Sequence, residues 1–302
     1  MRRPRALPPG GPVGIVSPSS PVKGSLLDAG IAVLESRGFR VRVAPHARDR
    51  AGHHAGTPAD RAADFIVFYA DPQIDVIWCA RGGSSACRLW PLLNWDYLAT
   101  LPPKLVVGYS DTTSLLIPFI QRVGTIALHG PFVFELGTLA PALLDWQLRL
   151  MQNTEPAGLV PALAAETLVS GTATGLLCGG CLSLVTATLG TPHQIDTAGK
   201  LLLIEDIGEA PHRIERYLVQ LAGAGLLQAA VGFVVGEATD ADETDALPVR
   251  QLWSEMLAPY GKPTVLGFPF GHVPNNYALP LGVQARLDAG TKTLTLLEAA
   301  VA

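Results

Sequence analysis

The 302-residue sequence predicts an α/β fold, with a parallel-sheet N-terminal domain and a smaller, mixed α/β C-terminal domain. Strand-length apolar runs alternate with helix-length segments, which is the order of a parallel sheet with helical crossovers. The runs are almost continuously apolar, as expected for strands that are covered on both faces. The alternation weakens over 141–170, so we expect domains at 1–140 and 171–302, joined by this segment as a linker.

The N-terminal domain is predicted to place a helix or helix-like run after each of its strands. Gly38 ends the first helix, and Thr57-Pro58 begins the second as an N-cap followed by proline. A Gly82-Gly83 turn follows the third strand. The strands are predicted at 13–16, 39–44, 76–80 and 105–107, and the helices at 25–37, 57–69, a run ending at 93, and 111–123.

The C-terminal domain is expected after an amphipathic helix at 142–151. It is predicted to begin with a glycine-rich turn and a helix over 179–189. Strands and helices then alternate, and the last two strands are expected to form an antiparallel pair. The strands are predicted at 201–205, 232–237, 263–267, 281–287 and 293–297, and the helices at 213–222 and 248–257.

Composition argues against several classes of protein. Hydrophobic residues make up 48% of the chain and charged residues 16%, which indicates a well-packed globular protein, and the net charge of −4 provides no basic surface for nucleic acid. No run of about 18 apolar residues predicts a membrane span, and the Arg- and Pro-containing first residues do not resemble a secretory signal. We therefore expect a cytoplasmic protein that binds neither nucleic acid nor membrane.

No metal or cofactor is expected. Cys178 and Cys181 have C-x-x-C spacing, but Cys79 and Cys87 are too far apart to supply a second such pair, so buried or spare thiols are favoured over zinc ligands. No HExxH motif occurs, and no glycine-rich phosphate loop follows the first strand. Any catalysis is therefore expected from side chains alone.

Polar residues follow the apolar runs just past the carboxyl ends of the strands, where functional groups gather in a parallel sheet. Ser110 follows the fourth strand, Glu205 and Asp206 follow the apolar run Leu201-Leu202-Leu203-Ile204, and His272 follows the strand at 263–267. Histidine can take the proton of a serine hydroxyl near neutral pH, and a carboxylate behind it stabilises the imidazolium. These residue types predict a serine hydrolase.

The same residues also have other interpretations. Ser110 could be an ordinary helix N-cap, because serine commonly bonds the first N–H groups of a helix. Chemistry alone does not distinguish Glu205 from Asp206 as the carboxylate. If Ser110 is the nucleophile, the backbone N–H groups of Asp111 and Gly83 are the candidate donors to the oxyanion.

Four ordered motifs resemble those of the LD-carboxypeptidases, also called muramoyltetrapeptide carboxypeptidases, a family of serine peptidases. Their order and spacing agree from about Val13 to Gly282, which is nearly the whole chain. The motifs are Ala80-Arg81-Gly82-Gly83, Gly108-Tyr109-Ser110-Asp111, Leu203 to Glu209, and Gly271-His272 followed by Asn275 and Leu279-Pro280-Leu281-Gly282.

The resemblance implies a fold, roles and a reaction. Ser110 matches the family's nucleophile, Glu205 its acid and His272 its base, which selects Glu205 over Asp206. The family has a flavodoxin- or Rossmann-like N-terminal domain that carries the nucleophile, and a C-terminal domain that supplies Glu and His. Its members are typically homodimers that need no metal. They remove the terminal D-alanine from cytoplasmic murein tetrapeptides, at an L,D-peptide bond, during cell-wall recycling.

Departures from the family pattern leave the substrate open. Ser84-Ser85-Ala86 follows the Arg-Gly-Gly motif where Tyr or Asn and a Gly are common, Cys181 replaces Asn, and His212 replaces Tyr. Arg81 and Ser84 are candidate substrate contacts. A guanidinium suits a peptide carboxylate, although a structural salt bridge is the alternative for Arg81. Two other hypotheses are a peptidyl-nucleotide hydrolase of the microcin C immunity type, and a non-catalytic ligand-binding α/β protein.

Overall fold

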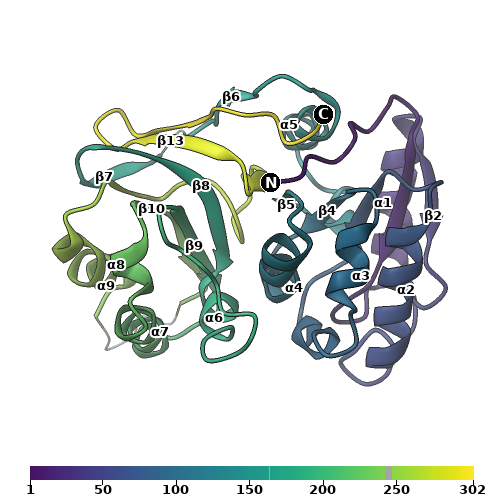
Figure 1. Ribbon diagram of the computed structural model, residues 1–302, viewed down its shortest axis with the longest axis horizontal. Helices are drawn as coiled ribbons and strands as arrows, with labels where there is room; N and C mark the ends of the chain where they lie inside the picture. The colour runs from purple at the N-terminus through teal and green to yellow at the C-terminus, as the bar shows by residue number, and fades with distance from the viewer. Residues whose placement is uncertain (163, 242–246) are drawn as a thin grey trace. The chain divides into compact units, whose positions relative to one another are not determined.

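The computed structural model describes residues 1–162, 164–241 and 247–302, which form two compact units. Unit 1 comprises residues 1–154, 278–280 and 299–302, and unit 2 comprises 155–277 and 281–298. Each unit contains a sheet with helices beside it (Figure 1). The predicted α/β class, with a parallel sheet and a second, mixed sheet, is confirmed.

The sheet of unit 1 has the strand order β12-β5-β4-β3-β1-β2. Strands β1 to β5 run parallel to their neighbours, as the apolar runs predicted for β1 to β4, whereas β5 was not predicted. The strands are β1 (Pro12–Val16), β2 (Arg40–Val43), β3 (Val76–Cys79), β4 (Leu105–Gly108), β5 (Ala127–His129) and β12 (Leu279–Leu281). The α-helices of this unit are α1 (Gly24–Ser36), α2 (Pro58–Ala70), α3 (Trp95–Thr100), α4 (Thr113–Pro118) and α5 (Pro141–Gln152).

The parallel order of this sheet brings several loops to one edge. Strands β3 and β4 are buried throughout, and β3 lies between β1 and β4. Their carboxyl ends therefore point the same way, and the loops after them are neighbours. The helix predicted at 111–123 is divided into a 3₁₀ turn η2 (Ser110–Thr112), α4 and a π-helical turn η3 (Phe119–Val123). Pro118 lies at the second junction and has no N–H to continue the helical bonding.

The sheet of unit 2 has the order β6-β14-β13-β8-β9-β10-β11-β7. Strands β8 to β11 are parallel and the outer pairs are antiparallel, including the predicted pair β13 and β14. Helix α7 contacts both α6 and α9 (Figure 1). The strands are β6 (Gly158–Leu159), β7 (Glu166–Val169), β8 (Thr172–Cys181), β9 (Leu201–Ile207), β10 (Gly232–Thr239), β11 (Thr264–Leu266), β13 (Gln284–Asp288) and β14 (Thr293–Leu296). The α-helices are α6 (Leu182–Thr186), α7 (Pro211–Gly223), α8 (Leu226–Ala229) and α9 (Val249–Leu257).

The prediction of a glycine-rich turn that begins at residue 179 is wrong. Gly179 and Gly180 continue strand β8 to Cys181, and helix α6 begins only at Leu182. Both glycines have positive φ angles, 116° and 137°. A Cβ on Gly179 would lie 2.0 Å from the Leu203 carbonyl oxygen of β9. Gly179 therefore allows β8 and β9 to approach each other, and neither glycine forms a turn.

The segment expected as a linker contains regular structure. Residues 141–170 hold α5, which belongs to unit 1, and β6 and β7, which belong to unit 2. The helices of both units are short, and α1, α2 and α7 have 13 residues each. Within the described ranges, no helix is long and apolar enough to cross a membrane.

Candidate active site

Ser110 lies directly after β4, in a turn with a strained backbone. Its φ angle is 55°, in the left-handed region that costs a residue with a side chain about 1–2 kcal/mol. Gly108 makes the turn possible, because a Cβ there would lie 2.6 Å from Thr112 Oγ1. Tyr109 takes the N-cap position of η2, so Ser110 does not have the N-cap position considered from the sequence. A strained strand-to-helix turn is typical of the nucleophilic serine in α/β hydrolases.

The Asp111 side chain holds the neighbouring loops together. It is buried, and its Oδ2 accepts hydrogen bonds from Ser19 Oγ at 2.6 Å and from the Ala86 N–H at 2.8 Å. These donors come from the loops after β1 and β3. Burial raises the pKa of Asp111, and the two hydrogen bonds oppose that rise. The carboxylate therefore has a structural role, and the oxyanion role of the Asp111 backbone N–H stays a prediction.

The loop after β3 lies against Ser110. A Cβ on Gly82 would lie 3.1 Å from Ser110 Cβ, so only glycine leaves the serine this much room. Gly83 has a φ angle of 120°, which also favours glycine. The Ser84 N–H donates to Ser20 Oγ at 3.1 Å, and the exposed Arg81 donates to the Pro21 carbonyl at 3.0 Å. These candidate residues therefore lie on one loop, fixed by the segment that follows β1.

In unit 2, Glu205 and His272 form a buried pair. Glu205 lies in β9 with its side chain 0% exposed, and His272 lies on the loop after β11 with its side chain 12% exposed. His272 Nδ1 is 2.7 Å from Glu205 Oε2, and the His272 backbone N–H donates to the same oxygen at 3.1 Å. With Nδ1 donating to the carboxylate, Nε2 is the basic nitrogen of the neutral ring. This arrangement suits a general base oriented by an acid.

Two glycines make room for Glu205. A Cβ on Gly271 would lie 2.2 Å from Glu205 Oε2, and a Cβ on Gly236 would lie 2.9 Å from Glu205 Cβ. Gly271 precedes His272 and has a φ angle of 84°, which any other residue would adopt only with strain. The close approach of the His272 loop to the carboxylate thus depends on glycine.

A β-bulge in β10 lies opposite Glu205. Gly236 and Glu237 both stand opposite this one residue of β9, because the flanking pairs join Val235 to Ile204 and Ala238 to Asp206. Bulges occur next to active sites because the extra residue redirects the side chains around it. Here the bulge places Gly236 against Glu205, and the Glu237 side chain lines a cavity instead.

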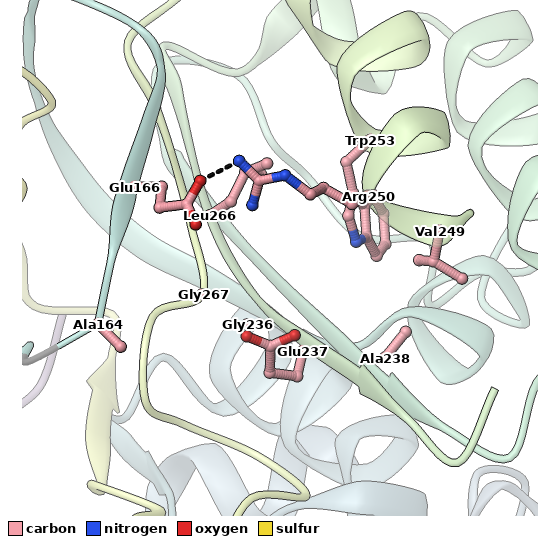
Figure 2. Close-up of a pocket in the computed structure, with 10 residues that line it drawn as sticks. All are labelled: Ala164, Glu166, Gly236, Glu237, Ala238, Val249, Arg250, Trp253, Leu266 and Gly267. Carbon is pink, nitrogen blue, oxygen red and sulfur yellow. Dashed lines mark hydrogen bonds and ion pairs between the residues drawn. The ribbon is translucent and has the colours of Figure 1, made fainter.

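The Glu237 side chain borders a cavity of about 160 Å³ in unit 2 (Figure 2). Arg250 of α9 and Glu166 of β7 form an ion pair at its wall, and Trp253 lines it as well. Because Gly236 both lines the cavity and packs against Glu205, a single backbone residue separates the cavity from the acid–base pair. The sequence did not predict this cavity, since its walls come from distant segments.

Glu205 and its neighbour Asp206 have different surroundings, because successive residues of a strand face opposite sides of the sheet. Asp206 Oδ2 accepts the Ser183 N–H in the first turn of α6 at 2.7 Å, and Cys181 Sγ donates to Oδ1 at 3.3 Å. Burial raises the pKa of Asp206 and that of the Cys181 thiol. Asp206 thus fixes α6, whereas Glu205 contacts His272. Cys181 is a buried thiol, and His212 is exposed at the start of α7.

Asn276 anchors the loop that carries His272, and sequence reasoning missed it. Its side chain is buried, and Oδ1 accepts the Gly271 N–H at 2.9 Å. The neighbouring Asn275, which formed part of the family motif, is exposed. Two adjacent asparagines cannot be ranked from the sequence alone, because the pattern does not show which one turns inward. The motif itself was the only signal that could have led to Asn276.

The candidate residues fall into two groups. Unit 1 contains Arg81, Gly83, Ser84, Ser110 and Asp111, whereas unit 2 contains Glu205 and His272. The structure brings Glu205 and His272 into contact in unit 2 and packs Gly82 against Ser110 in unit 1, whereas Arg81 and Ser84 are hydrogen-bonded to the segment after β1. In the part of the chain that the structure describes, no group of 3 or more His, Cys, Asp or Glu side chains could hold a metal ion.

Family models match both halves of the chain. The model described as the LD-carboxypeptidase N-terminal domain matches residues 13–130, and the LD-carboxypeptidase C-terminal domain matches residues 174–287. A putative carboxypeptidase of Streptomyces coelicolor is 40% identical over 298 residues, which cover 97% of this chain and 96% of the relative. A probable murein peptide carboxypeptidase of Bacillus subtilis is 34% identical over 305 residues, which cover 99% and 95%.

Solved structures share the fold. The microcin C7 self immunity protein MccF, in complex with glutamyl sulfamoyl guanosine, is similar to this chain with a TM-score of 0.89 at 22% identity. The match covers 100% of both chains. At this level of identity, the similarity shows the fold alone.

Proposed function

The chain belongs to the LD-carboxypeptidase family, and we propose that it is a serine carboxypeptidase that removes the terminal D-alanine from murein tetrapeptides. The bond cleaved is the L,D-peptide bond before that residue. The observation that carries the proposal is the buried Glu205–His272 contact, which joins a base to the carboxylate that orients it. The Bacillus subtilis relative, named as a murein peptide carboxypeptidase, supports this class of substrate.

Ser110 is the proposed nucleophile. Its Oγ attacks the scissile carbonyl carbon while His272 Nε2 takes the hydroxyl proton, and Glu205 stabilises the imidazolium that forms. His272 then gives this proton to the leaving amine of D-alanine as the C–N bond breaks. A water molecule, deprotonated by His272, hydrolyses the acyl-enzyme and regenerates the Ser110 hydroxyl. The scheme requires Ser110 Oγ and His272 Nε2 to come within hydrogen-bond reach.

Backbone N–H groups of Asp111 and Gly83 are proposed to bind the oxyanion. Asp111 directly follows the nucleophile, and Gly83 lies on the loop whose Gly82 packs against Ser110. Each oxyanion donor of this kind typically contributes about 100- to 1000-fold to kcat. Arg81 and Ser84, on the same loop, are proposed to contact the peptide.

The proposal includes a cytoplasmic location and a homodimer, both of which follow from the resemblance to the family. The mechanism uses no metal or cofactor, because the serine, histidine and glutamate side chains supply the nucleophile, the base and the acid. Light scattering on the purified protein tests the dimer. We expect twice the chain mass of 31.8 kDa, and a monomer at all concentrations would contradict this part of the proposal.

Hydrolysis of a murein tetrapeptide that ends in D-alanine tests the proposed activity. We expect a mass loss of one alanine, and an activity loss of about 10⁴-fold or more in Ser110→Ala. Ser36→Ala is the matched control, because it removes an exposed serine hydroxyl that bonds the Val33 carbonyl. The same peptide ending in L-alanine should resist cleavage. Turnover of an aminoacyl sulfamoyl nucleotide, with none of the tetrapeptide, would contradict the proposal.

A further inference from the structure

A cluster of hydrogen-bond donors surrounds Ser85, on the loop after β3. Ser85 Oγ lies 2.6 Å from His54 Nδ1, and Arg61 Nη1 donates to the same hydroxyl oxygen at 3.3 Å. On the other side of the imidazole ring, Arg88 Nη1 lies 3.3 Å from His54 Nε2. Ser85, His54, Arg61 and Arg88 are called the Ser85 cluster below. All of them belong to unit 1, as does Ser110.

The hydrogen bonds of the cluster make Ser85 a donor and not a second nucleophile. Burial is the largest cause that lowers the pKa of His54, and the neighbouring Arg61 and Arg88 lower it further, so the ring is neutral near pH 7. A guanidinium can only donate, so His54 Nε2 accepts from Arg88 and Nδ1 carries the ring proton. Ser85 Oγ then accepts from both His54 and Arg61. Its own proton is directed to a further acceptor, and His54 is not placed to remove it.

The cluster places two guanidinium groups, those of Arg61 and Arg88, around Ser85 and His54. Arg61 is 2% exposed, and no carboxylate of the described residues lies within salt-bridge distance of Arg61 or Arg88, although the buried Asp111 carboxylate attracts Arg61 from farther away. Arg61 Nη1 donates instead to backbone carbonyls, including that of Pro18 at 2.6 Å, and Nη2 has no hydrogen-bond partner within the described chain. Burial, together with the nearby Arg88, lowers the pKa of Arg61. The single carboxylate of Asp111 offsets only one of the two guanidinium charges, and the remaining positive charge favours a bound anion.

The loop that carries Ser85 reaches the candidate nucleophile at two points. Gly82 packs against Ser110, and the Ala86 N–H donates to Asp111 Oδ2 at 2.8 Å. Ser85 lies between these contacts, directly before Ala86. In the proposed reaction, the free carboxylate of the terminal residue lies only one residue beyond the attacked carbonyl. An anion-binding group for that carboxylate must therefore lie close to Ser110.

We infer that the Ser85 cluster binds the terminal carboxylate of the peptide substrate. The inference rests on the proposed function and adds the reason why the enzyme acts at a free carboxyl end. A hydroxyl that accepts two N–H bonds donates to the carboxylate, and Arg88 adds charge at the exposed side. The sequence suggested Arg81 for this role, but Arg81 lies outside the cluster and donates to the Pro21 carbonyl.

Ser85→Gly is the main test, because the residue has a φ angle of 75° that glycine adopts without strain. The probes are a murein tetrapeptide with a free terminal carboxylate and the same peptide as its terminal amide. The unmodified enzyme should prefer the acid. Ser85→Gly should raise KM for the acid about 10- to 100-fold with kcat nearly unchanged, since a bond to a charged group is lost in substrate and transition state alike.

Two further variants make the test independent of folding. Lys292→Gly is the matched control, because it relieves a φ angle of 59° at an exposed position of unit 2 and should leave KM unchanged. Arg88→Ala changes an exposed side chain of the cluster and should raise KM for the acid about 10-fold. Neither variant should alter the KM of the amide.

Binding to Ser110→Ala, measured by calorimetry, tests the same inference without turnover. The acid should bind more tightly than the amide, and adding Ser85→Gly should remove the difference. If Ser85→Gly and Arg88→Ala keep the full preference for the acid, or if only Arg81→Ala loses it, the inference is wrong and the proposed function stands. If the unmodified enzyme cleaves neither peptide and Ser110→Ala binds both equally, the proposed function and the inference both fail.

Discussion

Two histidine–carboxylate pairs in this molecule have nearly the same geometry in very different surroundings. His272 Nδ1 lies 2.7 Å from Glu205 in unit 2, and His46 Nδ1 lies 2.9 Å from Asp64 in unit 1. In both pairs, the carboxylate also accepts the backbone N–H of its histidine. Both carboxylates are buried, at 0% and 6% exposed, but the His272 side chain is 12% exposed and the His46 side chain 37%. The pairs are called the buried pair and the exposed pair after their histidines.

The difference teaches that geometry alone does not make a histidine a catalytic base. Since both carboxylates are buried, the difference lies at the imidazole: a shielded imidazolium such as that of His272 interacts strongly with its carboxylate, because little water screens the two charges. At His46 water reaches the imidazole, so the attraction to Asp64 is screened more and contributes less. His272 lies just past the carboxyl end of a parallel strand, whereas Asp64 lies in α2 and ties down the chain around His46. We therefore expect the buried pair to act in catalysis and the exposed pair to stabilise a loop.

The largest effect is expected from His272→Gln. Glutamine keeps a polar side chain but cannot take the proton of Ser110, so kcat should fall about 10⁵-fold on the murein tetrapeptide. His46→Gln is the matched control, since it breaks the exposed pair with the same substitution, and its activity should stay within about 2-fold. Comparable losses of kcat in His272→Gln and His46→Gln would contradict the different roles assigned to the two pairs.

A second comparison substitutes the carboxylates. Glu205→Gln can still accept a hydrogen bond from His272 but cannot stabilise the imidazolium, so kcat should fall about 10⁴-fold. Asp64→Asn should reduce kcat by less than about 3-fold. Steady-state kinetics with matched thermal melts separates catalysis from folding. If Glu205→Gln remains active while Asp64→Asn is inactive, the roles assigned to the two pairs are reversed.

The sequence predicted the parts of the molecule that depend on local patterns. Continuous apolar runs predicted the buried parallel strands, and the short segment around Ser110 predicted a strand-to-helix turn, because each involves neighbouring residues. The sequence-based prediction failed at β8. A glycine that lets two strands pack closely cannot be distinguished in the sequence from a glycine in a turn.

Contacts between residues that are far apart in the sequence leave no local pattern from which they could be predicted. Ser85 and His54 are 31 residues apart, and His46 and Asp64 are 18 apart, so neither contact could be predicted. Glu205 and His272 are 67 residues apart; their chemistry suggested a pairing of His272 with Glu205 or Asp206, and only the family resemblance selected Glu205. Burial decides which distant groups matter, and burial is a property of the folded chain.

The adjacent residues Asn275 and Asn276 test whether burial decides which side chain anchors the His272 loop. Asn276→Ala leaves the buried Gly271 N–H without its acceptor, which should cost about 1–3 kcal/mol of unfolding free energy. Because Gly271 precedes His272, kcat should fall as well. Asn275→Ala removes an exposed side chain and should change the stability by less than about 0.5 kcal/mol. Urea unfolding of both variants measures the difference, and equal stability would contradict the anchoring role of Asn276.

The smallest effect is expected from the pH dependence of the exposed pair. The hydrogen bond to Asp64 raises the pKa of His46 above its ordinary value of 6.5. A raised folded-state pKa means that protonated His46 stabilises the fold below pH 6.5, and that this stabilisation is lost as the pH rises through the higher pKa. The Tm of the unmodified protein should therefore exceed that of His46→Gln at about pH 6, by at most about 3 °C, and the two should converge by about pH 9. A gap that widens toward pH 9 would show that neutral His46 makes the stabilising contact, and the exposed pair would then resemble the buried one more closely than its surroundings imply.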